Sequence, residues 1–194
     1  MEEKNKQRET DKTNMKNLRY KSLPIDMKPN NFKYTTGKWY KTNDISICNR
    51  GFHCCKRAID AMRYVNCEVL ALVEVKGDCR KQDNKECWSE IKIVKTHKWT
   101  KEDSISLVIY AAELAEPIYR KSYPNDDRII KAIEAAKKVL KNDTQKNRDT
   151  AAAAAFAAAH AAFAAAHAAF AAAHAEFEKT LNKIEEWIQE RVKF

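Results

Sequence analysis

The chain has 194 residues, enough for one modest domain with an extended element or for two small domains. Its 36 lysines and arginines exceed its 27 aspartates and glutamates, which gives a net charge of +9. This charge favours an anionic partner (nucleic acid, a nucleotide or an acidic protein surface), unless it only reflects a lysine-rich proteome. The first residues contain no apolar segment that could act as a signal peptide, so we expect a cytoplasmic protein with six reduced cysteines, which excludes a disulfide-stabilised secreted domain.

The N-terminal part divides into a tail and a small domain. Residues 1–22 are too polar to form a core, and we expect them to be a disordered or frayed tail. Residues 23–99 alternate short apolar runs with turns, which predicts a mainly antiparallel α+β domain. Its expected elements are a hairpin or two short strands at 32–40, a strand at 45–48, a helix at 54–65, a strand at 67–75, a turn at Lys76-Gly77-Asp78 and an antiparallel partner strand at 87–95.

The densest group of reactive side chains lies at residues 48–55. One hypothesis is a zinc site, although no pair has CxxC spacing; its ligands would be Cys48, His53, Cys54 or Cys55, with Cys79, Cys87 or His97 completing the set. A second makes His53 catalytic, with Glu90 as the carboxylate and Ser89 beside it, as in ADP-ribosyltransferase-like sites. The interpretation we favour is structural: His53 hydrogen-bonds a turn, the cysteines pack as small apolar residues, and no metal or cofactor is bound.

The same region resembles an uncharacterised domain of phage and prophage proteins. The likeness covers about 70 residues and includes a Gly-Phe-His-x-Cys turn, matched by Gly51, Phe52, His53 and Cys55, followed by a helix and a valine-rich strand. The resemblance implies no particular activity.

Residues 100–141 predict two packed helices. The first, at 104–119, is apolar on most sides and reads as buried; Thr100 or Asp103 can cap it, and Pro117 should kink or end it. The second begins at Asp126 and Asp127 and carries a stripe of isoleucines, and residues 142–148 form a polar connector. From AAELAEPIY through IIKAIEAAKKVL to the following alanine repeat, this part is similar to helical immunity proteins of bacterial polymorphic toxin systems.

The last segment, residues 149–194, is an alanine-rich heptad repeat. Residues 151–175 contain 19 alanines, three phenylalanines and three histidines, which predicts one long helix on the order of 70 Å. Its apolar stripe keeps one register to the end, which predicts a helix-packing seam with a left-handed supercoil. The seam residues are Phe156, His160, Phe163, His167, Phe170, His174, Phe177, Leu181, Ile184 and Ile188.

Three other interpretations of this helix are weaker. Alanine is barely apolar and three histidines are costly in lipid, which argues against a membrane span. The Phe/His stripe differs from the flat threonine/alanine face of ice-binding helices. Metal binding would need a symmetric partner helix, because histidines seven residues apart on one helix are about 10 Å apart. Protonation of the histidines should weaken the packed state below about pH 6.

These patterns predict an α+β chain with a self-associating C-terminal helix, hence a homo-oligomer. The leading functional hypothesis is a non-catalytic phage or mobile-element protein that antagonises or sequesters a component of a bacterial defence or toxin system. The second is a nucleic-acid-binding protein that uses the basic N-terminal half, with the helix as dimeriser. The third is a nucleotide-modifying enzyme that uses His53 and Glu90.

Overall fold

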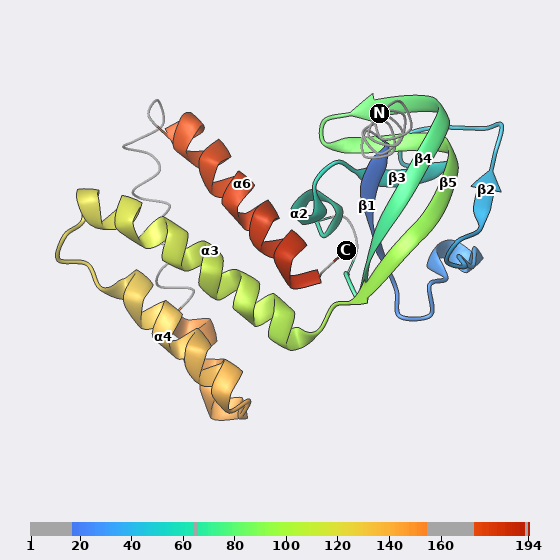
Figure 1. Ribbon diagram of the computed structural model, residues 1–194. Helices are drawn as coiled ribbons and strands as arrows, with labels where there is room; N and C mark the ends of the chain where they lie inside the picture. The colour runs from blue at the N-terminus through green and yellow to red at the C-terminus, as the bar shows by residue number, and fades with distance from the viewer. Residues whose placement is uncertain (1–16, 64–65, 155–172, 193) are drawn as a thin grey trace, which may run out of the picture. The chain divides into compact units, whose positions relative to one another are not determined.

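A computed structural model of the protein describes residues 17–63, 66–154, 173–192 and 194. These residues form two compact units. The sheet unit contains the described residues up to Trp99 together with Ile188–Phe194, and the helical unit contains Thr100–Trp187. An antiparallel sheet followed by helices confirms the predicted α+β class (Figure 1).

The sheet has five antiparallel strands. They are β1 (Leu18–Leu23), β2 (Trp39–Lys41), β3 (Phe52–Cys55), β4 (Val69–Gln82) and β5 (Lys85–Lys98). The hairpin of β4 and β5 confirms the predicted antiparallel pairing, and β5 pairs along its other edge with β3 and β2. Because β1 connects β3 to β4, four of the strands close into a ring.

The core of this unit lies inside the ring. Val69, Ala71, Val73 and Val75 of β4 alternate toward an interior that Ile91 and Ile93 also fill. Leu70, on the opposite face of β4, is fully buried as well. Burial of both faces explains why this strand reads as a nearly continuous apolar run. The end of the chain belongs to the same unit: Ile188 is fully buried, and the rings of Tyr20 and Phe194 lie 6.1 Å apart.

Three expectations for the N-terminal half are wrong. Strand β1 occupies part of the predicted tail, because its alternating residues pair with β4 along their whole length. The strand expected at 45–48 is a turn closed by a bridge between Ser46 and Arg50, with Cys48 at a φ of 64°. The helix expected at 54–65 is reduced to α2 (Ala58–Ala61), because Cys54 and Cys55 belong to β3.

Two turns also differ from expectation. The segment 32–40 contains only β2, preceded by the 3-10 helix η1 (Pro29–Asn31) and a bridge from Thr36 to Ile93. Strand β4 does not turn at Gly77 but continues to Gln82 through a register shift, or β-bulge, between Lys76 and Cys79. The φ of +82° at Gly77 is one that glycine adopts readily, so this residue serves the bulge.

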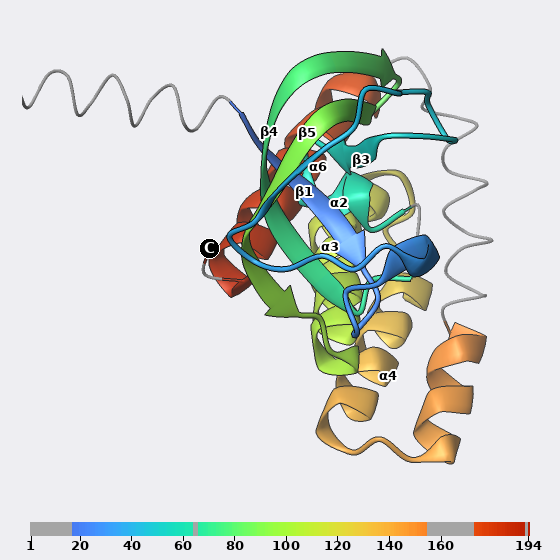
Figure 2. The same ribbon diagram turned by 90° about the vertical axis from the view of Figure 1, so that its right-hand side faces the viewer.

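The helical unit is built from α3 (Lys101–Ser122), α4 (Arg128–Lys141), a helix described over 145–154 and the first part of α6 (Ala173–Val192). Thr100 caps α3 in a capping box with Asp103, as predicted, and α3 continues through Pro117 to Ser122. Helix 145–154 follows a short connector and runs back alongside α4 (Figure 2).

Helix α3 is not the buried helix that its composition suggested. One stripe, including Ile109 and Tyr119, packs against Ile129 and Ile133 of α4. Off that stripe, Val108 is 62% exposed and Ile118 is 43% exposed. Part of the apolar surface of α3 is therefore exposed, although Tyr110 on another side of the helix stacks on Trp187 of α6.

Candidate functional sites

His53 organises the turn that precedes β3. Its Nε2 accepts a hydrogen bond from the backbone N–H of Cys48 at 2.9 Å, so this nitrogen is unprotonated. Burial lowers the pKa of His53, and the charge of Lys21 lowers it further, which keeps the ring neutral. This contact agrees with the structural interpretation of His53.

The neighbouring motif residues support the same turn. Gly51 has a φ of +96°, and a Cβ there would lie 2.6 Å from Sγ of Cys87. Phe52 is part of the core, and Cys55 is 2% exposed. The Gly-Phe-His-x-Cys motif therefore shapes a turn and anchors a strand.

The zinc hypothesis does not fit the positions of its proposed ligands. Cys54 and Cys55 are consecutive in β3, so their side chains lie on opposite faces of the sheet. His97 pairs with Leu70 and lies ten residues along β5 from Cys87, which pairs with His53. All six cysteines are free, and among the described residues no three His, Cys, Asp or Glu side chains are grouped to hold a metal ion.

The proposed catalytic residues have separate contacts. Glu90 pairs with Lys41 at 3.5 Å and with Lys76 at 3.4 Å, whereas His53 contacts the turn at Cys48. The hydroxyl of Ser89 accepts a hydrogen bond from the N–H of Asp78 in the β-bulge. Within the described ranges, no hydrogen bond or ion pair joins His53 to Glu90. These contacts indicate that Ser89 and Glu90 stabilise the strands of the sheet.

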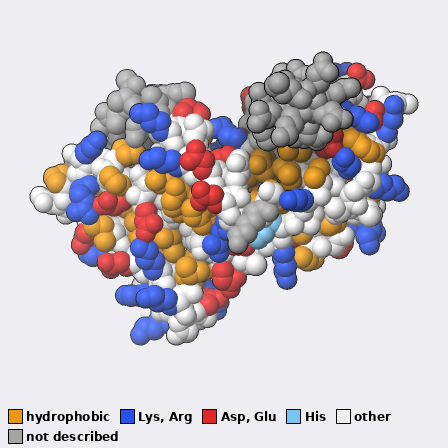
Figure 3. Space-filling model, viewed as in Figure 1, with side chains coloured by type: hydrophobic (Ala, Val, Ile, Leu, Met, Phe, Trp, Pro, Cys, Tyr) orange, Lys and Arg blue, Asp and Glu red, His pale blue; other side chains and the backbone are white. Residues whose placement is uncertain are grey.

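A second candidate site, which the sequence did not reveal, is an apolar groove in the helical unit. Its volume is about 390 Å³. Aliphatic side chains of three helices line it: Ile105, Val108, Ile109 and Ala112 of α3, Ala132, Ile133, Ala136 and Val139 of α4, and Ala151 and Ala152 of helix 145–154. Figure 3 shows hydrophobic side chains at the surface of this unit, bordered by charged ones. Its size and lining are typical of a binding site.

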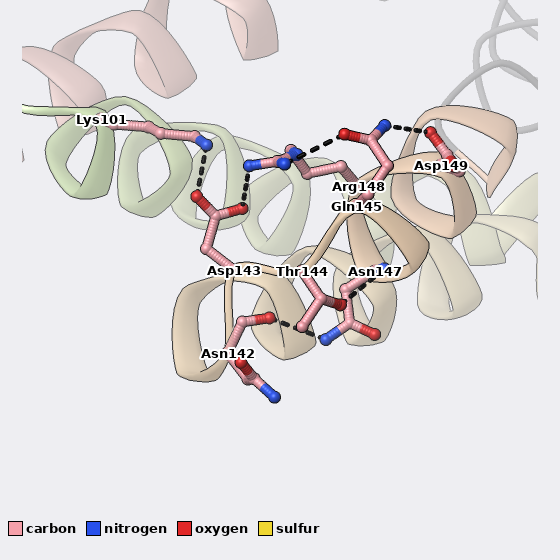
Figure 4. Close-up of polar contacts among 8 residues, drawn as sticks. All are labelled: Lys101, Asn142, Asp143, Thr144, Gln145, Asn147, Arg148 and Asp149. Atoms are coloured by element: carbon pink, nitrogen blue, oxygen red, sulfur yellow. Dashed lines mark hydrogen bonds and ion pairs between the residues drawn. The ribbon is translucent and has the colours of Figure 1, made fainter.

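The polar rim of the groove is a chain of contacts between α3 and helix 145–154 (Figure 4). Asp143 accepts from Nζ of Lys101 at 2.5 Å and from Arg148 at 3.0 Å, and Arg148 also donates to Gln145. Both Lys101 and Arg148 line the groove. The two charged side chains that line the groove are therefore cations, whereas the carboxylates of Asp143 and Asp149, which accepts from Gln145 at 2.7 Å, do not line it.

The predicted heptad seam is described only at its end. The side chains of Phe156, His160, Phe163, His167, Phe170, His174 and Phe177 lie outside the described residues. Ile184 is 8% exposed and Ile188 is fully buried, so these two already pack within the chain. Among the helices that the structure describes, none has the length and the apolar composition that a membrane span requires.

The amino-acid sequence contains only indirect indications of the groove. Ala112, Ala132 and Ala136 interrupt two apolar stripes with small side chains, and Val108 lies off the stripe of α3 that meets α4. Small residues at facing positions leave space, but only the packing shows that no larger side chain of the described residues fills it.

Comparison with known families gives a match over the N-terminal half of the chain. Residues 17–104 match a domain of unknown function, DUF7666. The match includes all five strands and the first turn of α3, and it extends the resemblance to an uncharacterised domain over the whole sheet. No curated protein and no solved structure matches the chain.

Proposed function

We propose that this chain is a non-catalytic binding protein whose helical unit receives an amphipathic helix of a protein partner. The observation that carries the proposal is the apolar groove of about 390 Å³ between α3, α4 and helix 145–154. Recognition of a helix in a groove uses apolar side chains spaced three or four residues apart on the bound helix.

The lining and the rim define the chemistry of the bound helix. Ala112, Ala132 and Ala136 are small, so a partner side chain can enter deeply between α3 and α4. Lys101 and Arg148 are the charged residues that line the groove, and their positive charge complements an acidic residue at one end of the partner helix. The proposed partner is therefore a helix with an apolar stripe and an adjacent Asp or Glu.

The finer role is the antagonism or sequestration of a component of a bacterial defence or toxin system by a phage or mobile-element protein. The resemblances of both halves to such proteins motivate this role. Self-association through the C-terminal helix belongs to the same proposal. Because Ile184 and Ile188 are buried within the chain, self-association would use the seam before Ile184.

The test is to fill the groove. The partner is captured from the native host with the full chain, identified by mass spectrometry, purified and titrated by calorimetry. Ala132→Trp places an indole in the groove and should weaken partner binding at least tenfold. Ala115→Trp is the matched control, because Ala115 is exposed on α3 and does not line the groove. Unchanged affinity for the Ala132→Trp variant would refute the proposal.

One observation favours nucleic-acid binding as a second candidate. The ring of Trp39 lies 4.1 Å from Nζ of Lys76 and 4.9 Å from Nζ of Lys92 on the sheet, a combination that can stack a base beside a phosphate. Glu74 and Glu90 pair with the same lysines and would compete with phosphate. Fluorescence anisotropy with single-stranded RNA should show binding that falls steeply with salt if this candidate is correct.

A further inference from the structure

A small cavity of about 80 Å³ lies in the sheet unit, and residues of β1, β3, α2 and β5 line it. One of them is Lys21 of β1, whose side chain is partly buried. The wall around this lysine includes the apolar side chain of Ala61 and the thiols of Cys54 and Cys55. None of the described residues that line the cavity is acidic. The cavity therefore combines an amine with a largely apolar wall.

The amine of Lys21 has neutral surroundings among the described residues. Its Nζ donates a hydrogen bond to the backbone carbonyl of His53 at 2.7 Å and lies 5.5 Å from the centre of the Tyr34 ring. Burial raises the pKa of Tyr34, whereas burial and the charge of Lys21 lower the pKa of His53, so neither ring is charged at pH 7. An ammonium group that loses hydration without gaining a carboxylate is destabilised relative to the neutral amine. Burial accordingly lowers the pKa of Lys21.

The carboxylates of the neighbouring elements pair with other groups. Asp60 of α2 accepts from Arg57 at 3.0 Å and from Asn84 at 2.7 Å. Glu86 of β5 accepts from Arg19 at 2.5 Å. Neither carboxylate lines the part of the cavity that holds Lys21. Within the described residues, Lys21 thus has no counter-charge that would hold it in the ammonium form.

The other nucleophiles at the cavity are less reactive or have contacts of their own. Burial raises the pKa of Cys55 to about 12 and raises the pKa of Cys54 further. Because the thiolate is the reactive form of cysteine, both thiols are poor nucleophiles at pH 7. Lys85 also lines the cavity, but its Nζ contacts Sγ of the exposed Cys48 at 3.1 Å. Lys21 is therefore the amine that burial prepares for reaction.

We propose that this cavity binds a short aliphatic aldehyde as an imine on Nζ of Lys21. A lysine that is desolvated in an apolar pocket is a nucleophile for carbonyl compounds. The lone pair of the neutral amine attacks the carbonyl carbon, and a proton of the amine moves to the oxygen to give a carbinolamine. Loss of water then forms the C=N bond, and nothing is oxidised or reduced. The N–H of a protonated imine can still donate to the carbonyl of His53, as Nζ does in the free chain.

The size of the cavity selects the aldehyde. A volume of about 80 Å³ has room for about five water molecules, which suits a compound of two or three carbons and excludes a sugar or an aromatic ring. The site lies in the sheet unit, whereas the groove lies in the helical unit, so its success or failure does not bear on the proposed helix-binding function.

Trapping of the imine in the full wild-type chain tests the site. Propanal and sodium cyanoborohydride are added at pH 7, where the reductant converts an imine into a stable secondary amine, and peptide mass spectrometry locates the label. We expect Lys21 to be labelled at least tenfold faster than Lys95, an exposed lysine of β5 that does not line the cavity. Labelling of Lys21 at the rate of Lys95 or slower, or faster labelling of Lys85 than of Lys21, would overturn the proposal.

A larger aldehyde and a variant separate binding in the cavity from general amine reactivity. Benzaldehyde is too large for the cavity, so it should label Lys21 no faster than Lys95; a preserved preference for Lys21 would contradict binding in the cavity. Lys21→Arg keeps the positive charge but cannot form the imine, so the rapidly labelled site should disappear while the circular dichroism spectrum stays unchanged. Rapid labelling that persists in Lys21→Arg would place the reactive amine elsewhere and refute the site.

Discussion

The sheet unit and the helical unit differ in how they treat apolar and charged groups. Around the sheet, both faces of β4 are buried and even the ion pair between Arg19 and Glu86 lies inside, with side chains 10% and 4% exposed. In the helical unit, Val108 remains 62% exposed and the Lys101–Asp143 pair lies at the surface, with side chains 50% and 41% exposed. Branched and aromatic residues fill the ring, whereas alanines leave a groove.

This difference affects both the stability of each unit and its capacity to bind a partner. A close-packed interior makes the sheet sensitive to single substitutions, because neither a void nor an unpaired charge can be relieved there. An open apolar groove lowers the stability of the helices that form it, but it leaves surface for a partner. The expected effects of substitution should therefore be large in the sheet unit and small in the helical unit.

The largest effect is expected for Arg19→Met. Removal of the guanidinium leaves Glu86 buried without its closest partner, which should destabilise the sheet unit by about 3–5 kcal/mol. Urea unfolding followed by tryptophan fluorescence measures the loss. Arg50→Met breaks the exposed pair with Asp44, and this control should cost less than about 1 kcal/mol. Equal losses for the two variants would show that the interior pair has no special role.

The same ion pair predicts a loss of stability in acid. Burial alone would raise the pKa of Glu86, but hydrogen bonds from Arg19 and Trp88 hold it below its ordinary value of 4.5. Because the folded-state pKa is the lower one, the stabilisation is complete above about pH 4.5 and is lost as the pH falls through the folded-state pKa. Unfolding curves between pH 7 and pH 3 should show this loss in the wild type and a weaker dependence in Glu86→Gln.

Gly77→Ala tests the close packing of the bulge in β4. A Cβ at Gly77 would lie 2.3 Å from Oγ of Ser89, at a φ of +82°. Gly37 has the same φ with nothing within 4 Å, so Gly37→Ala measures the backbone cost alone. We expect about 1–2 kcal/mol for Gly37→Ala and roughly 2–4 kcal/mol for Gly77→Ala, because overpacking adds to the strain. Similar values in chemical denaturation would mean that the bulge accommodates the methyl group.

The bulge also shows the limit of prediction from the sequence. Lys76-Gly77-Asp78 has the composition of a turn, and only the pairing of Cys79 with Trp88 shows that the strand continues. Strand β1 was missed for the same reason, since its polar residues become a strand only through pairing with β4, far along the chain. Long-range pairing is not encoded in a local pattern.

Local patterns, in contrast, were sufficient elsewhere. The apolar strand β4, the capping of α3 by Thr100 and the role of His53 in a turn follow from neighbouring residues, and the structure has all three. The groove could not be predicted this way, because it depends on which apolar side chains remain uncovered after the chain has packed.

The capping box of α3 offers a smaller effect in the helical unit. The N–H of Asp103 donates to Oγ1 of Thr100 at 3.1 Å, and the N–H of Thr100 donates back to the Asp103 carboxylate at 2.9 Å. Thr100→Ala removes the first bond and should cost about 1 kcal/mol, whereas Thr100→Ser should keep it. Hydrogen exchange of the α3 amides localises the loss to this helix. Faster exchange confined to the sheet unit would assign Thr100 a different role.

The smallest effect is expected for Asp143→Asn, at the rim of the groove. The pKa of Asp143 is lowered by its hydrogen bond from Lys101 and by the charge of Arg148, so the carboxylate is ionised at pH 7. Its pairs are exposed, and salt should screen them over about 10 Å at 0.1 M, so the small loss of stability should vanish in about 0.5 M salt. The loss in Arg19→Met should persist in the same salt, because the side chains of that pair are only 10% and 4% exposed. The same substitution raises the rim charge by one and should strengthen binding of an acidic helix. A salt-resistant loss in Asp143→Asn would mean that the rim is as tightly packed as the interior of the ring, and the contrast between the two units would then disappear.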